Sequence, residues 1–114
     1  MSVTIYHNNR CSKSRQTLAL LTERGIEPEV VAYLDTPPSA ETINTLLALL
    51  GYDSPRKMMR TKEDIYKELK LADATDAELI QAMVENPKLI ERPIVVANGK
   101  AAMGRPPEAV LDIL

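Results

Sequence analysis

Residues 3–15 read VTIYHNNRCSKSR, and this stretch decides the fold class. Residues 3–6 are β-rich and alternate in polarity, which predicts a strand. The polar residues after them lead into a predicted helix that ends at Gly25, and a second strand is predicted at 29–34. A strand–loop–helix–strand order favours a right-handed unit whose two strands are parallel.

The rest of the chain predicts a helical stretch followed by a hairpin and a last helix. Helices are expected after Ser39 and from two capping-box patterns, and strands are expected on both sides of the Asn98-Gly99 turn. The predicted ranges are 39–50, 61–69 and 75–85 for the middle helices, 94–97 and 100–103 for the strands, and 108–114 for the last helix. The predicted fold class is therefore α/β and thioredoxin-like. It has a βαβ half, a ββα half and a mixed four-stranded sheet, in a single domain of residues 1–114 whose insertion, roughly 36–91, is mostly helical.

Composition narrows the class of function. The chain has 114 residues with a formal net charge of −2, and a nucleic-acid-binding protein would need a large basic excess. No apolar run is long enough to span a membrane, and residues 1–6 lack the pattern of a signal peptide. One Cys and one His exclude an intrachain disulfide, a cysteine zinc site and a two-histidine metal motif. We expect a cytoplasmic protein that binds neither nucleic acid, membrane nor metal.

The only thiol, Cys11, lies where chemistry is expected. It follows a predicted strand and begins a helix, whose N-terminus carries a partial positive charge that lowers a thiol pKa. Residues 1–22 contain basic residues and His7 but no acidic residue. A lone Cys is often an inert buried side chain. The cationic, polar neighbours favour a reactive thiolate instead.

A cationic helix N-terminus can also bind an anion. The chain has no phosphate-loop glycine pattern, and Thr17 stands where a Cys-x5-Arg loop would need Arg. What remains is Cys11-x-x-x-Arg15, where backbone N–H groups and Ser12 or Ser14 could face the anion. Arg15 could instead form a salt bridge within the helix. His7 could share the hydrogen bonds of the thiolate, act as its cationic neighbour or be a solvated loop residue.

Three isolated arginines, Arg60, Arg92 and Arg105, are candidates for holding an oxyanion. A lone arginine is usually a solvated surface charge. However, the Arg92-Pro93 step enters an apolar strand, and in thioredoxin-like folds that step holds a cis-proline beside the active-site cysteine. We therefore predict a cis bond at Arg92–Pro93 and the convergence of the three arginines on Cys11.

These residues resemble the glutaredoxin-coupled arsenate reductase family, which typically reads His-Asn-Pro-x-Cys-x-x-Ser-Arg-x-Thr-Leu around its cysteine. The resemblance runs over residues 3–114 and looks closest to the YfgD-type branch, which carries Cys-Ser-Lys-Ser. One departure is Asn9, where the family usually has Pro. The further matching segments are 34–38, 59–63, 91–96 and 104–108.

The resemblance implies an enzyme with the catalytic residues Cys11, His7 and Ser14, and with Arg60, Arg92 and Arg105 as the arsenate-binding residues. It also implies that the thiolate attacks arsenate, that glutathione attacks the adduct, and that glutaredoxin resolves the resulting mixed disulfide. Glutathione and glutaredoxin are then external reductants, with no cofactor bound to the chain.

Two other functions remain open. Spx-type regulators share the fold and bind RNA polymerase, but their redox switch is a Cys-x-x-Cys pair and the second position here is Ser14. A monothiol glutaredoxin-like oxidoreductase without an oxyanion substrate would use Cys11 equally well. It would leave the three arginines without a role.

Overall fold

The computed structural model describes residues 3–114, which form two compact units. The first unit comprises the chain up to Thr36 together with Arg92–Leu114, and the second is Pro37–Glu91. The second unit spans the segment in which the helical insertion was expected. That the two units make one domain stays a prediction.

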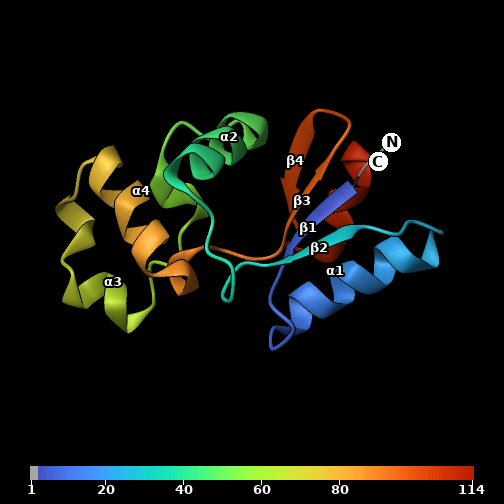
Figure 1. The fold of residues 1–114 in the computed structure, drawn as a ribbon, viewed down its shortest axis with the longest axis horizontal. Coiled ribbons are helices and arrows are strands. Elements are labelled where there is room, and N and C mark those ends of the chain that lie inside the picture. The colour runs from blue at the N-terminus through green and yellow to red at the C-terminus, as the bar shows by residue number, and fades with distance from the viewer. Residues whose placement is uncertain (1–2) are drawn as a thin grey trace. The chain divides into compact units, whose positions relative to one another are not determined.

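The first unit is built on a four-stranded sheet with the strand order β2-β1-β3-β4 (Figure 1). β1 is parallel to β2 and antiparallel to β3, and β3 is antiparallel to β4. This is the predicted mixed sheet, with a parallel βαβ half and an antiparallel hairpin. The hairpin turn has positive φ at both Asn98 and Gly99, as the sequence signal requires. The strands are β1 (Val3–His7), β2 (Glu29–Ala32), β3 (Ile94–Ala97) and β4 (Lys100–Met103).

Two helical elements cover one face of this sheet. They are α1 (Ser12–Glu23) and the 3-10 helix η4 (Pro107–Ile113), which contact one another (Figure 1). Their buried side chains pack on alternate residues of β1 and β3, because successive residues of a strand point to opposite faces. The core of this unit is Val3, Ile5, Leu21, Val95, Ala97 and Val110. It fixes β1 and α1, and so the turn between them that carries Cys11.

The second unit is helical, as predicted. It contains α2 (Ala40–Leu50), α3 (Asp64–Glu68), α4 (Asp76–Glu85) and three short 3-10 helices. The Ser39 hydroxyl accepts the N–H of Thr42 and caps α2, and Thr75 and Glu78 form the predicted capping box of α4. The 3-10 helices, which sequence patterns did not indicate, are Pro55–Met58, Leu71–Asp73 and Pro87–Leu89.

Two predicted boundaries and one predicted helix type were wrong. β2 ends at Ala32, because the carbonyl of Ala32 accepts the N–H groups of Asp35 and Thr36 in a turn. α3 begins at Asp64 rather than at the Thr61 capping box, because Glu63 is extended. The last helix is 3-10 rather than α-helical.

Within residues 3–114, no helix has the length and apolar character that crossing a membrane requires.

Candidate active site

Cys11 is the N-cap residue of α1, as predicted from its place after a strand. Its N–H donates to the carbonyl of Asn8 at 3.0 Å, and its own carbonyl accepts the N–H of Arg15 at 3.0 Å, the first hydrogen bond of the helix. The first turn of α1 contains no acidic residue. Cys11 is 8% exposed, so its thiol is sheltered from bulk water by the turn and the helix end.

The surroundings of the Cys11 thiol favour its thiolate form. Burial raises the pKa of Cys11, but this is outweighed by the backbone N–H groups of Ser14 and Lys13 and by the positive charge of Arg92. The net result is a pKa below the ordinary value of a cysteine. This agrees with the reactive-thiol interpretation, because the thiolate is the nucleophilic form.

Two of the three candidate arginines lie at this thiol. Nη2 of Arg105 donates to Sγ of Cys11 at 3.7 Å, and Nε of Arg105 donates to the carbonyl of Arg92 at 2.7 Å. The Arg92–Pro93 bond is cis, as predicted, and Arg105–Pro106 is also cis. Nε of Arg92 is buried and finds no acceptor among the described residues. The site therefore holds a donor that an added anion could satisfy.

His7 and Ser14 form a buried pair beneath the Cys11 turn. Oγ of Ser14 lies 2.6 Å from Nδ1 of His7, and it accepts the N–H of Asn8 at 3.0 Å. Burial, followed by the charge of Arg15, lowers the pKa of His7, so the ring is neutral near pH 7. Of the three roles left open for His7, this geometry favours membership of a hydrogen-bond network. Ser14 is 0% exposed, and its hydroxyl is occupied inside the protein.

The loop before Cys11 is held by Arg15. Nη1 of Arg15 donates to the carbonyl of Asn9 at 3.1 Å, which ties the start of the loop to the first turn of α1. The sequence also allows Arg15 a salt bridge within the helix, but its side-chain hydrogen bond goes to the backbone. This hydrogen bond holds Asn9, the position at which the family usually has Pro. Ser12 is exposed at the helix start.

Arg60 belongs to the second unit, where it lies between two carboxylates. Nη1 of Arg60 forms an ion pair with Glu63, and its Nε lies 4.0 Å from the Glu91 carboxylate. The N–H of Arg60 donates to the carbonyl of Leu89 at 2.7 Å, so the residue is held locally. Its convergence on Cys11 stays a prediction.

No group of three or more His, Cys, Asp or Glu side chains gathers as a metal site anywhere in the described chain.

The family model for the ArsC family matches residues 6–113. The chain belongs to the ArsC family.

Relatives are similar to this chain over nearly its full length. The uncharacterized protein YfgD of Escherichia coli K12 is 67% identical, over 98% of this chain and 96% of its own. An arsenate reductase of Haemophilus influenzae is 52% identical, with all of both chains covered. The solved structure of an arsenate reductase from Vibrio cholerae is 59% identical and superposes with a TM-score of 0.98, covering 100% of this chain and 98% of that one. The family, the fold and the thioredoxin-like order expected from the sequence are thus confirmed.

Sequence reasoning missed one packing contact beneath the site of this ArsC-family chain. Gly104 is buried against Pro93 and Thr17, and its N–H donates to the Pro93 carbonyl at 2.8 Å. A Cβ at Gly104 would lie 2.6 Å from Cγ of Pro93 and 2.6 Å from Oγ1 of Thr17. The absence of a side chain at Gly104 therefore lets the Arg105 loop, the Arg92 loop and α1 meet.

Proposed function

We propose that this ArsC-family protein is an arsenate reductase whose nucleophile is the Cys11 thiolate. The observation that carries the proposal is the environment of that sulfur. Its pKa is lowered, Arg105 donates to it at 3.7 Å, and the nearby Arg92 keeps a buried donor without an acceptor. A buried unsatisfied donor is unfavourable by about 1–3 kcal/mol, and a bound oxyanion would supply the missing acceptor. The full-length similarity to proteins named arsenate reductase supports the choice of oxyanion.

The proposed reaction has two steps at the sulfur of Cys11. The Cys11 thiolate attacks arsenic(V), an S–As bond forms, and one arsenate oxygen leaves as water after protonation. Glutathione then attacks the adduct, so that a disulfide forms to Cys11 while the S–As electron pair stays on arsenic, which becomes trivalent. Two thiols lose two electrons, arsenic gains them, and arsenite is released. In both steps an anionic thiolate approaches an anionic arsenic group. Arg92, Arg105 and Arg60 hold the oxyanion and offset this repulsion with their positive charges.

His7 and Ser14 have a positioning role in this proposal. The Ser14 hydroxyl fixes the N–H of Asn8, and the Asn8 carbonyl in turn holds the N–H of Cys11. The His7 ring supports the Ser14 hydroxyl from the end of β1. The pair therefore sets the position of the thiol through the turn.

Turnover needs thiols from outside the chain, because Cys11 is the only cysteine. We propose glutathione as the attacking thiol and glutaredoxin as the protein that reduces the mixed disulfide. Both reductants belong to a reducing compartment, so the proposal places the protein in the cytoplasm.

The test is a coupled assay with arsenate, glutathione and glutaredoxin. We expect Cys11→Ser to abolish arsenite formation, and Arg92→Lys or Arg105→Lys to lower kcat/KM for arsenate roughly ten- to a hundredfold. Lysine cannot make the planar two-point contact with an oxyanion, and each charge-assisted contact contributes about 1.5–3 kcal/mol. The exposed Arg24, at the end of α1, gives the control variant Arg24→Lys.

Two results would contradict the proposal. Thiol oxidation through Cys11 that does not depend on arsenate would favour the monothiol oxidoreductase. Specific capture of RNA polymerase, without reductase activity, would favour a regulator.

A further inference from the structure

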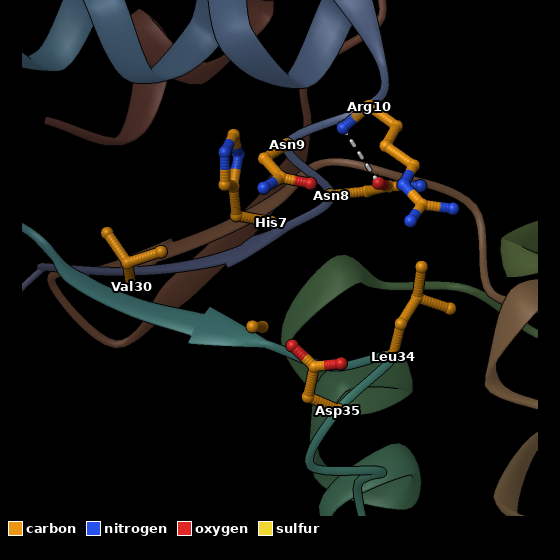
Figure 2. A pocket seen from close by; sticks show the side chains of 8 residues that line it. His7, Asn8, Asn9, Arg10, Val30, Leu34 and Asp35 are labelled. Atoms are coloured by element: carbon orange, nitrogen blue, oxygen red, sulfur yellow. Dashed lines mark hydrogen bonds between the residues drawn. The ribbon is translucent and has the colours of Figure 1, made fainter.

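We infer that a pocket beside the Cys11 turn binds glutathione; the inference rests on the proposed function, which needs this thiol. The pocket has a volume of about 450 Å³, within the range of roughly 300–1,000 Å³ that is typical of small-ligand sites. Its walls come from the loop after β1 and from β2 with the turn that follows (Figure 2). Its lining includes His7, Arg10, Val30, Ala32, Leu34 and Asp35.

The pocket and the two arginines flank β1 on opposite sides. β1 is paired with β2 on one side, where His7 is opposite Ala32, and with β3 on the other, where Tyr6 is opposite Ile94. Arg92 leads into β3, so the oxyanion donors belong to the β3 side of the Cys11 turn. The pocket lies on the β2 side. An oxyanion and a second thiol could thus reach Cys11 from different directions.

The loop that forms one wall of the pocket also holds Cys11. Asn8 and Arg10 line the pocket, the Asn8 carbonyl accepts the Cys11 N–H at 3.0 Å, and Cys11 follows Arg10 in sequence. The Asn8 side chain accepts the N–H of Arg10 at 3.0 Å and closes the turn (Figure 2). A peptide bound against this wall would therefore lie along the loop that carries Cys11.

The opposite wall carries two exposed aliphatic side chains, Val30 and Leu34. Val30 is 47% exposed and Leu34 39% exposed, and only Leu69 joins them as an exposed large hydrophobic side chain in residues 3–114. Val30 and Ala32 are two residues apart on an edge strand, so they share a face. These side chains offer apolar contact to the methylene groups of a bound peptide.

Two charges of opposite sign complete the pocket. Figure 2 shows the Arg10 guanidinium and the Asp35 carboxylate on facing walls. Neither side chain forms an ion pair with another group of the described chain. Glutathione carries an ammonium at its γ-glutamyl end and carboxylates at both ends, which suits Asp35 for the ammonium and Arg10 for a carboxylate. A protein partner would need a far larger surface, of about 1,000 Å² or more.

The test measures recognition of glutathione without arsenate. The Cys11 thiolate attacks glutathione disulfide, forming a mixed disulfide and releasing one glutathione thiolate, which intact-protein mass spectrometry follows in time. We expect Asp35→Asn and Arg10→Gln each to slow this step roughly two- to fivefold, since an exposed charge contact contributes up to about 1 kcal/mol. With the neutral 2-hydroxyethyl disulfide, which has no charges to recognise, both variants should react at the wild-type rate.

Matched controls are Asp112→Asn and Arg24→Gln, which remove exposed charges outside the pocket. They should react at the wild-type rate with both disulfides. In a second measurement, S-methyl glutathione added to Cys11→Ser should shift the backbone amide signals of Val30 and Asp35.

The inference is overturned if the pocket variants behave like the controls, or if the analogue shifts signals elsewhere. It is also overturned if these variants slow only the reduction of the preformed mixed disulfide by glutaredoxin, which would assign the surface to the protein partner. The assay contains no arsenate. Its outcome therefore tests glutathione binding even if the protein does not reduce arsenate.

Discussion

Gly104→Ala should displace both active-site arginines at once. The added Cβ would lie 2.6 Å from Pro93 Cγ and from Thr17 Oγ1, whereas ordinary contacts begin at 3.4 Å, so the neighbours must separate by ~0.8 Å. Thr17 cannot yield easily, because it is 0% exposed and its hydroxyl donates to the Lys13 carbonyl at 2.8 Å. The strain therefore falls on the loops of Arg92 and Arg105, which flank Pro93 and Gly104 in sequence.

The size of the effect follows from the contact at the sulfur. Nη2 of Arg105 lies 3.7 Å from Sγ of Cys11, and a further ~0.8 Å would take it beyond hydrogen-bonding distance. Loss of this contact and retreat of the Arg92 charge should raise the Cys11 pKa toward that of a free thiol, about 8.5. A displacement near 1 Å at a catalytic group can lower the rate about a hundredfold. Overpacking of this kind also costs about 1–3 kcal/mol of stability.

The assay is the rate of Cys11 alkylation against pH, with thermal unfolding measured alongside. The control is Gly99→Ala in the β3–β4 turn, where a Cβ meets no atom within 4 Å but φ is +72°. That variant should lose stability from backbone strain and keep the wild-type alkylation midpoint. The reasoning is refuted if Gly104→Ala keeps both its alkylation midpoint and its arsenate kinetics.

Two further predictions concern stability. The pKa of His7 is lowered in the folded protein, so below about pH 6.5 the unfolded chain binds more protons and the free energy of unfolding should fall. Urea unfolding at pH 7.5 and at pH 5.5 should show a smaller decrease in this free energy for His7→Gln than for the wild type. Equal decreases in the two proteins would contradict the prediction. In the second unit, Arg56 donates to Tyr66 Oη at 2.9 Å and to backbone carbonyls, so Arg56→Ala should cost roughly 2–3 kcal/mol of stability. Lys57→Ala removes only the exposed pair with Asp53 and should leave the free energy of unfolding nearly unchanged. Similar losses in the two variants would show that the Arg56 contacts contribute little.

The sequence predicted most of the fold because its signals are local. The strands alternate or are continuously apolar, the Asn98-Gly99 turn needs positive φ, and the capping box at Thr75 satisfies its own helix start. The similar capping-box pattern at Thr61 did not predict the helix start correctly. There the N–H of Glu63 bonds to the Arg60 carbonyl and the Glu63 carboxylate pairs with the Arg60 side chain, so a turn occupies the residues that would have capped the helix.

The sequence indicated candidate residues for the site but not the contacts among them. The acid-free segment identified Cys11, and the Arg-Pro step predicted the cis bond that the structure has. The convergence of Arg105 on Cys11 was predicted, but no sequence pattern indicated that its Nε would also donate to the carbonyl of Arg92. The sequence likewise did not predict the pocket on the β2 side. Arg10 and Asp35 are 25 residues apart in sequence and are brought to one pocket only by the pairing of β1 with β2.

The thiolate and an oxyanion would share the positive charge of Arg92, which gives that residue two separable effects. Before an oxyanion binds, Arg92 lowers the pKa of Cys11. A bound dianion repels the thiolate, so by linkage each anion weakens the other unless the arginines compensate both. Arg92→Lys keeps the charge but loses the planar donor, so it should alter oxyanion binding more than thiol reactivity. Arg92→Ala should alter both, and alkylation measured without oxyanion separates the two effects.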